Sequence, residues 1–193
     1  MMQCREPYPS ETYRPEAGQR PMRLLVLGIG NALLSDDGAG LHVLTRLRHE
    51  AAAAPPSQVE IEYIDGGTVG LALAPLIEDA DGVVVLDAMR LGAAPGTVHV
   101  HVGAQMDAVV GCHCGTPHEV SLGDLFTAVR LLGRLPARRA LIGIEPASLD
   151  WGTAPTPAVA AGLPQAARAV QALLHAWSQA GAAPQPALEE LSS

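Results

Sequence analysis

The chain has 193 residues, of which 48% are hydrophobic and only 3% aromatic, and its formal net charge is −8. This length and apolar content suit one buried α/β domain with a core of Leu, Val, Ile and Ala. The acidic balance argues against a nucleic acid partner, because phosphate binding needs a basic stripe. The three cysteines, the lack of an apolar leader and the absence of any membrane-length run predict a cytoplasmic, reducing location.

The two ends of the sequence differ from the region between them. Residues 1–21 mix Pro, Glu and Arg without an apolar period, so we expect a disordered extension there. One domain is predicted over residues 22–179. Residues 180–193 are expected to form a loose C-terminal tail.

Strand and helix patterns alternate along this predicted domain. Apolar runs at Arg23–Leu27 and Gly82–Ala88 are typical of strands buried on both faces of a parallel sheet. Further strands are predicted at Val59–Asp65, at Pro95–Val102 as an edge strand, and at Arg139–Pro146. Helices are predicted at Gly38–Glu50, Val69–Ile77, Ser121–Gly133 and Pro157–Gln179. This order predicts a three-layer α/β/α sandwich around a mostly parallel sheet.

Carboxylates follow the first three predicted strands. Asp36 and Asp37 lie in the loop after the first strand, Asp65 ends the second, and Asp87 ends the third. In such sheets functional groups gather beyond the carboxyl ends of the strands, so these side chains are expected along one rim. A turn is predicted at Gly66, Gly67 and Thr68 on the same rim. Its two glycines would let a substrate backbone approach closely, so we expect this turn to have a peptide-docking role.

The segment GCHCGTPHE, residues 111–119, offers nitrogen and sulfur ligands in a glycine-rich loop before a helix. Its candidate ligands are Cys112, His113, Cys114, His118 and Glu119. Carboxylate together with imidazole suits a divalent transition ion such as nickel, zinc or iron. Cys112 and Cys114 are too close for the usual zinc pattern and have no second pair, so we interpret them as two unpaired loop thiols.

Simpler interpretations remain open for most of these residues. Asp36 or Asp37 could cap the following helix, Asp65 could be a turn residue, and His118 could lie at a helix entry. Asp87 is harder to explain as a structural residue, because it follows four apolar residues on a central strand. A dinucleotide site is disfavoured, since Leu33 replaces the third glycine of the fingerprint and the acidic pair opposes a pyrophosphate.

The ordered set LVLGIGNALLSDDGAG, DGGT, VVVLDA, PHEVSLGDLF and IGIEP resembles the hydrogenase maturation proteases. These endopeptidases process the large subunit of nickel-iron hydrogenases. The resemblance extends from about Met22 to about Trp177. It implies a five-stranded, mostly parallel twisted sheet of the phosphorylase/hydrolase-like kind. One strand is antiparallel, and residues 97–102 are the candidate.

The resemblance also implies three catalytic and metal-contacting residues, which fall on Asp37, Asp87 and His118. Asp36 is then expected to cap or to orient Asp37. The implied cofactor is nickel supplied by the substrate, and the implied partner is the immature hydrogenase large subunit, whose C-terminal extension is removed. The resemblance also implies that no Ser or Cys nucleophile is used, and the chain shows no G-x-S-x-G elbow or other triad motif.

Two other classes of function remain as alternatives. A non-proteolytic nickel-sensing chaperone would bind the immature large subunit and release it uncut. A hydrolase of another kind, such as a peptidyl-transfer-RNA hydrolase, conflicts with the acidic charge and the lack of a basic groove. We expect a monomer that binds neither nucleic acid nor membrane.

Overall fold

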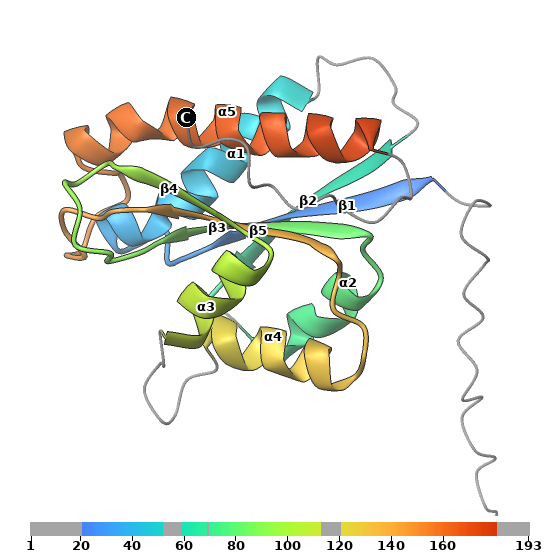
Figure 1. Cartoon of the computed structure of the whole chain (residues 1–193). Coiled ribbons are helices and arrows are strands. Elements are labelled where there is room, and N and C mark those ends of the chain that lie inside the picture. The colour runs from blue at the N-terminus through green and yellow to red at the C-terminus, as the bar shows by residue number, and fades with distance from the viewer. Residues whose placement is uncertain (1–20, 52–58, 69, 113–120, 181–193) are drawn as a thin grey trace, which may run out of the picture.

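The computed structural model describes residues 21–51, 59–68, 70–112 and 121–180 (Figure 1). These residues contain a five-stranded sheet with the strand order β2-β1-β3-β5-β4. The strands are β1 (Met22–Ile29), β2 (Val59–Gly67), β3 (Gly82–Ala88), β4 (Val98–Val102) and β5 (Arg138–Ile144). The predictions for residues 1–20 and 181–193 concern segments outside the described residues.

Four of the strands are parallel, and β4 pairs antiparallel with β5 at one edge. The central position of β1 and β3 explains their apolar sequences, because both faces of each strand are covered. Leu27 and Val85, for example, are completely buried. Burying such a side chain contributes roughly 1.5–3 kcal/mol to folding. The predicted mixed sheet with one antiparallel strand is confirmed.

Helices cover both faces of the sheet (Figure 1). On one face lie α1 (Ala39–Ala51) and α5 (Pro157–Gln179), which pack with the first core cluster, including Val26 and Leu86. On the other face lie α2 (Ala74–Glu78), α3 (Ala104–Cys112) and α4 (Leu122–Leu131), around the second cluster. The three-layer sandwich is therefore confirmed.

The helix α4 begins where its sequence predicts. The hydroxyl of Ser121 accepts a hydrogen bond from the backbone N–H of Asp124, and the Asp124 carboxylate accepts one from the Ser121 N–H. This reciprocal arrangement is a capping box, which satisfies two donors that the first helical turn otherwise leaves unpaired. It fixes the start of the helix that follows the segment containing His118.

Three local expectations were wrong. The helix α3 was not predicted, because its apolar side chains do not form one stripe and only Met106 and Val110 are buried. The strand β2 continues through Gly66 and Gly67, so the predicted turn begins only at Thr68. The helix expected at Val69–Ile77 is a 3-10 turn (Leu71–Leu73) followed by the short α2.

Within the described ranges, no helix is long and apolar enough to cross a membrane.

Candidate active site at the carboxyl edge of the sheet

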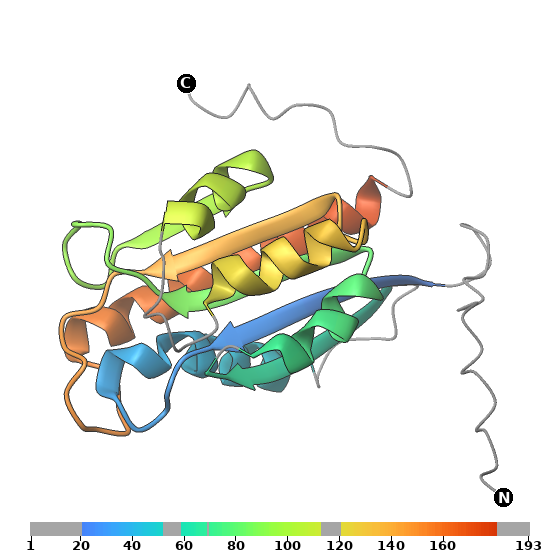
Figure 2. The ribbon, with the colours of Figure 1, turned by 90° about the horizontal axis from the view of Figure 1, so that it is seen from below.

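The parallel strands β1, β2, β3 and β5 end at the same edge of the sheet, here called the rim (Figure 2). In the register of the sheet, Gly28 of β1 lies opposite Asp65 on one side and Leu86 on the other. Asp87, the next residue of β3, lies opposite Gly143 of β5. The carboxylates of Asp65 and Asp87, near the ends of β2 and β3, therefore lie at one rim, and Asp37 lies on the turn that follows β1.

The pleat separates two of these carboxylates. Leu86 points to the face covered by α1 and α5, so Asp87 points to the face covered by α2, α3 and α4. Asp65 pairs with Gly28, which packs against α1, and therefore points to the opposite face from Asp87. Asp65 is exposed, and its Oδ1 accepts a hydrogen bond from the Gly67 N–H at 2.9 Å, as in a turn.

Two glycines allow the loop after β1 to pack tightly. Gly30 has φ +129°, and a Cβ there would overlap the carbonyl oxygen of Asp37. A Cβ on Gly40 would overlap the carbonyl oxygens of Ile29 and Leu86. Gly30 thus lets the loop pack on itself, and Gly40 lets α1 approach the ends of β1 and β3.

Asp36 is completely buried in a 3-10 turn, η1 (Ser35–Gly38), between β1 and α1. Its Oδ2 accepts hydrogen bonds from the N–H groups of Ala147 (2.8 Å) and Ser148 (3.0 Å) and from the Thr156 hydroxyl (2.9 Å). Its Oδ1 accepts the Thr156 N–H at 2.6 Å. Burial by itself raises the pKa of Asp36, but these hydrogen bonds outweigh it and hold the pKa below its usual range. The carboxylate connects η1 to the β5–α5 loop.

Asp37, the next residue, is half-buried on the same turn. Its Oδ2 accepts a hydrogen bond from the Asn31 N–H at 2.7 Å, and its own N–H donates to the Leu34 carbonyl at 2.8 Å. No donor in the described part of the chain reaches its Oδ1. The backbone of Asp37 is thus fixed by the buried Asp36, while one carboxylate oxygen remains available.

His118 lies outside the described residues, as do His113, Cys114 and Glu119. The ends of its segment are described: Cys112 is an exposed free thiol at the end of α3, and Ser121 caps α4. Both helices cover the face toward which Asp87 points, and the end of α3 and the start of α4 lie at the rim (Figure 2). The described residues alone contain no cluster of three metal-binding side chains.

Gly66 and Gly67 end β2 beside the loop that carries Asp37, and Thr68 follows the strand. The Gly30 N–H donates to the Gly67 carbonyl at 2.9 Å. No atom lies within 4 Å of the position that a Cβ on Gly67 would take. This part of the rim therefore has open backbone next to the loop of Asp37.

Glu145 is a second buried carboxylate at the rim, and the sequence analysis did not single it out. It is 6% exposed and accepts hydrogen bonds from three consecutive N–H groups, those of Leu91 (2.8 Å), Gly92 (3.3 Å) and Ala93 (3.2 Å). Burial raises the pKa of Glu145, but these bonds outweigh it and lower the pKa. The bonds hold the loop that follows Asp87. The sequence feature that could have identified Glu145 is the one that identified Asp87: a carboxylate that directly follows a run of apolar strand residues.

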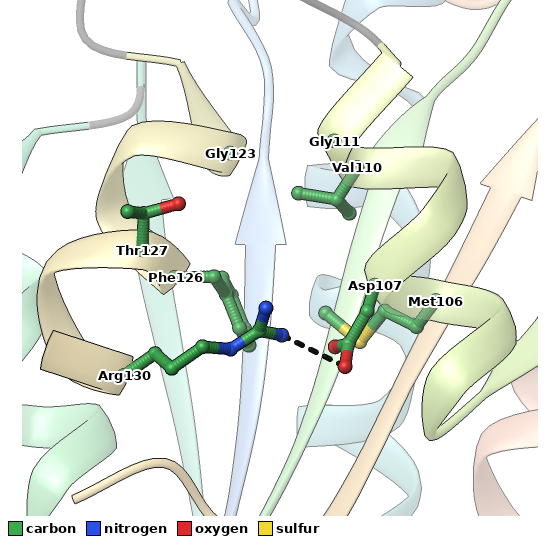
Figure 3. A pocket seen from close by; sticks show the side chains of 8 residues that line it. All are labelled: Met106, Asp107, Val110, Gly111, Gly123, Phe126, Thr127 and Arg130. Carbon is green, nitrogen blue, oxygen red and sulfur yellow. Dashed lines mark ion pairs between the residues drawn. The ribbon is translucent and has the colours of Figure 1, made fainter. Parts of the chain in front are cut away.

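A hollow between α3 and α4 lies on the same side of the sheet, with Met106, Val110 and Phe126 among its lining residues (Figure 3). Asp107 in this hollow pairs with Arg130 at 2.8 Å and with Arg139 at 2.7 Å. The hydrogen bonds from Arg139 are the largest cause that lowers the pKa of Asp107. Because two guanidinium groups already neutralise this carboxylate, the hollow is not a second cation site.

An α/β sandwich with carboxylates beyond the ends of its parallel strands has the architecture of the α/β domains that bind their ligands at that edge. Residues 41–173 match the family HycI, described as hydrogenase maturation protease. The chain is 36% identical over 159 residues to the hydrogenase expression/formation protein HupD of Rhodobacter capsulatus, covering 82% of this chain and 74% of that protein. It is 34% identical over 154 residues to the hydrogenase 2 maturation protease of Escherichia coli strain K12, covering 79% and 91%.

Solved structures agree with these sequence relatives. The hydrogenase maturating endopeptidase HybD from Escherichia coli matches with a TM-score of 0.71 at 33% identity, covering 81% of this chain and 94% of that chain. The chain belongs to the hydrogenase maturation protease family.

Proposed function

We propose that the protein is an endopeptidase that removes the C-terminal extension of the nickel-loaded, immature large subunit of a nickel-iron hydrogenase. Family membership supports the processing of a hydrogenase large subunit. The observation that carries the proposal is the pair Asp37 and Asp87, two half-buried carboxylates, one on the turn that follows β1 and one near the end of the adjacent strand β3. No basic group in the described residues makes a hydrogen bond or ion pair with Asp37.

The donor set fits a transition ion brought by the substrate. Asp37 and Asp87 supply oxygen ligands, and His118, in the segment between α3 and α4, supplies an imidazole nitrogen. Oxygen and nitrogen donors of this kind suit divalent nickel. Bound nickel can polarise a carbonyl group or lower the pKa of a water.

The chain's own residues perform the remaining tasks. Asp36 fixes the turn that presents Asp37, and Glu145 holds the loop that follows Asp87. Asp37 or Asp87 serves as the general base for the attacking water. The segment Gly66, Gly67 and Thr68, with open space at Gly67, binds the peptide chain that leads to the scissile bond. No Ser or Cys nucleophile takes part.

The test is a cleavage assay with a precursor large subunit from the same organism, prepared with and without nickel. Mass spectrometry follows the precursor's C-terminus. The proposal predicts loss of a C-terminal peptide only with wild type and only from the nickel-loaded precursor. Asp37→Asn, Asp87→Asn and His118→Ala should abolish cleavage. Asp79→Asn, an exposed residue at the far end of α2, is the matched control and should cleave normally.

Two results would contradict this proposal. Equal cleavage of precursors with and without nickel would show that the metal is not recognised. Nickel-dependent binding that releases the precursor uncut would instead identify a nickel-sensing chaperone.

A further inference from the structure

An apolar patch lies beside the rim, formed by Leu33, Leu149 and Trp151. These side chains are 53%, 37% and 82% exposed. Leu33 belongs to the loop that carries Asp37, whereas Leu149 and Trp151 belong to the β5–α5 loop, more than 100 positions later. Single exposed apolar side chains are common on protein surfaces, but a contiguous group beside a candidate active site is a sign of an interaction surface.

Backbone hydrogen bonds hold the two loops side by side. Leu34 and Gly152 form a parallel bridge, in which the Ser35 N–H donates to the Gly152 carbonyl at 2.7 Å and the Gly152 N–H donates to the Leu33 carbonyl at 2.9 Å. In a parallel bridge the preceding residues are also neighbours, so Leu33 and Trp151 lie next to each other. Leu33 and Trp151 therefore form one surface built from two loops, and Leu149 precedes Trp151 by two residues on the second loop.

Asp36 holds the β5–α5 loop of this surface in place. Its buried carboxylate binds Ala147 and Ser148 at one end of the β5–α5 loop and Thr156 at the other. Both ends of the β5–α5 loop thus bind the same carboxylate, which fixes the loop. Trp151 lies on this fixed loop with its side chain exposed to solvent. Such preorganisation lowers the entropic cost of binding, and tryptophan is enriched among the residues that dominate binding energy.

We propose that this patch docks the folded body of the precursor large subunit, through an apolar surface next to the precursor's nickel centre. The inference rests on the proposed function. Leu33 lies within one turn of Asp37, since the Asp37 N–H donates to the carbonyl of the adjacent Leu34. A partner whose metal reaches Asp37 therefore comes within reach of the patch.

The position of the patch suits a folded body. A partner that docks as a folded body covers about 800 Å² of the surface around the group it brings to Asp37, and the patch begins within one turn of Asp37. The patch adds apolar surface that is continuous with the rim. Substrate recognition then has two parts. The rim binds the precursor's nickel, and the patch binds the protein surface of the precursor around that metal.

The experiment measures steady-state cleavage of the nickel-loaded precursor by wild type, Trp151→Ala and Leu33→Ser. The control Leu131→Ser removes a leucine that is 83% exposed, about as much as Trp151, at the end of α4 that lies away from the rim. The two patch variants should raise KM about tenfold or more, because truncating a central apolar anchor weakens association by that order. Trp151→Phe should recover most of the affinity. Single-turnover cleavage at saturating precursor should stay within about twofold of wild type for every variant.

Three results would overturn the docking proposal. The first is an unchanged KM in Trp151→Ala with wild type active. The second is a lower single-turnover rate at unchanged KM, which would assign Trp151 to the chemistry. The third is a wild-type dimer that Trp151→Ala dissociates without affecting KM, which would make a second copy the occupant. If wild type binds the precursor but does not cleave it, loss of that binding in Trp151→Ala supports the docking surface while the proposed protease function fails.

Discussion

Thr156 donates two hydrogen bonds to the carboxylate of Asp36, one from its backbone N–H at 2.6 Å and one from its hydroxyl at 2.9 Å, across 120 positions of sequence. Ala147 and Ser148 donate the other two. One buried carboxylate therefore joins the loop after β1 to the loop before α5. The position of Asp37 depends on this connection, because Asp37 is the next residue.

Replacing Asp36 with Ala should destabilise the fold by about 2–4 kcal/mol. The change leaves the N–H groups of Ala147, Ser148 and Thr156 without their acceptor, and each such group costs roughly 1–3 kcal/mol where water does not replace the carboxylate. Urea unfolding followed by circular dichroism measures the loss. Asp79→Ala, at an exposed aspartate at the far end of α2, is the control and should stay within about 0.5 kcal/mol of wild type. Equal stability of the two variants would contradict the role of Asp36.

The stability contribution of Asp36 should depend on pH. The pKa of Asp36 is lower in the folded protein than in the unfolded chain, so folding favours the ionised form. This stabilisation is complete above the ordinary pKa of about 4 and disappears as the pH falls through the lower folded pKa. The free energy of unfolding should therefore decrease with acidification below about pH 4 more steeply in wild type than in Asp36→Asn. Parallel pH profiles of the two proteins would contradict this account.

Glu145→Gln should release the loop that follows β3. The amide can still accept hydrogen bonds through its oxygen, but its NH₂ group then faces backbone donors, which costs about 1–3 kcal/mol. Hydrogen exchange should accelerate at the amides of Leu91, Gly92 and Ala93. Glu60→Gln, in an exposed ion pair with Arg23, is the matched control and should leave these amides protected. Unchanged exchange in Glu145→Gln would show that the loop is held by other contacts.

Gly40→Ala should destabilise the protein by about 2 kcal/mol or more, because its Cβ would overlap two backbone carbonyl groups that have no room to move. Gly111→Ala is the control within a helix. No atom lies within 4 Å of its Cβ position, so alanine should be neutral or stabilising by up to about 1 kcal/mol. Thermal unfolding distinguishes the two. A neutral Gly40→Ala would mean that α1 can shift away from the ends of β1 and β3.

The sheet was predictable because its signals are local. The apolar runs of β1 and β3 predict strands buried on both faces, and the alternation of β2 predicts a strand buried on one face. Because these strands are parallel, the residues that follow them, including Asp37 and Asp87, are expected at the same edge of the sheet. The helix α3 was missed because its buried residues, Met106 and Val110, are too few to set a period. The contacts of Asp36 and Glu145 depend on loops brought together only by the tertiary fold.

The apolar patch could not be predicted from the sequence for the same reason. Leu33 and Trp151 are adjacent only because a bridge joins their loops, and no sequence spacing encodes that neighbour relationship. Recognition of the family came instead from an ordered set of motifs around the rim. Those motifs identify the residues at the strand ends but not the hydrogen bonds that position them.

The most direct test of the central claim is the mass of a nickel-loaded precursor large subunit after incubation with wild type, with Asp87→Asn and with the control Asp79→Asn. We expect a shortened large subunit with wild type and with Asp79→Asn, and an intact one with Asp87→Asn. Cleavage by Asp87→Asn at the wild-type rate would contradict the assignment of the rim as the active site.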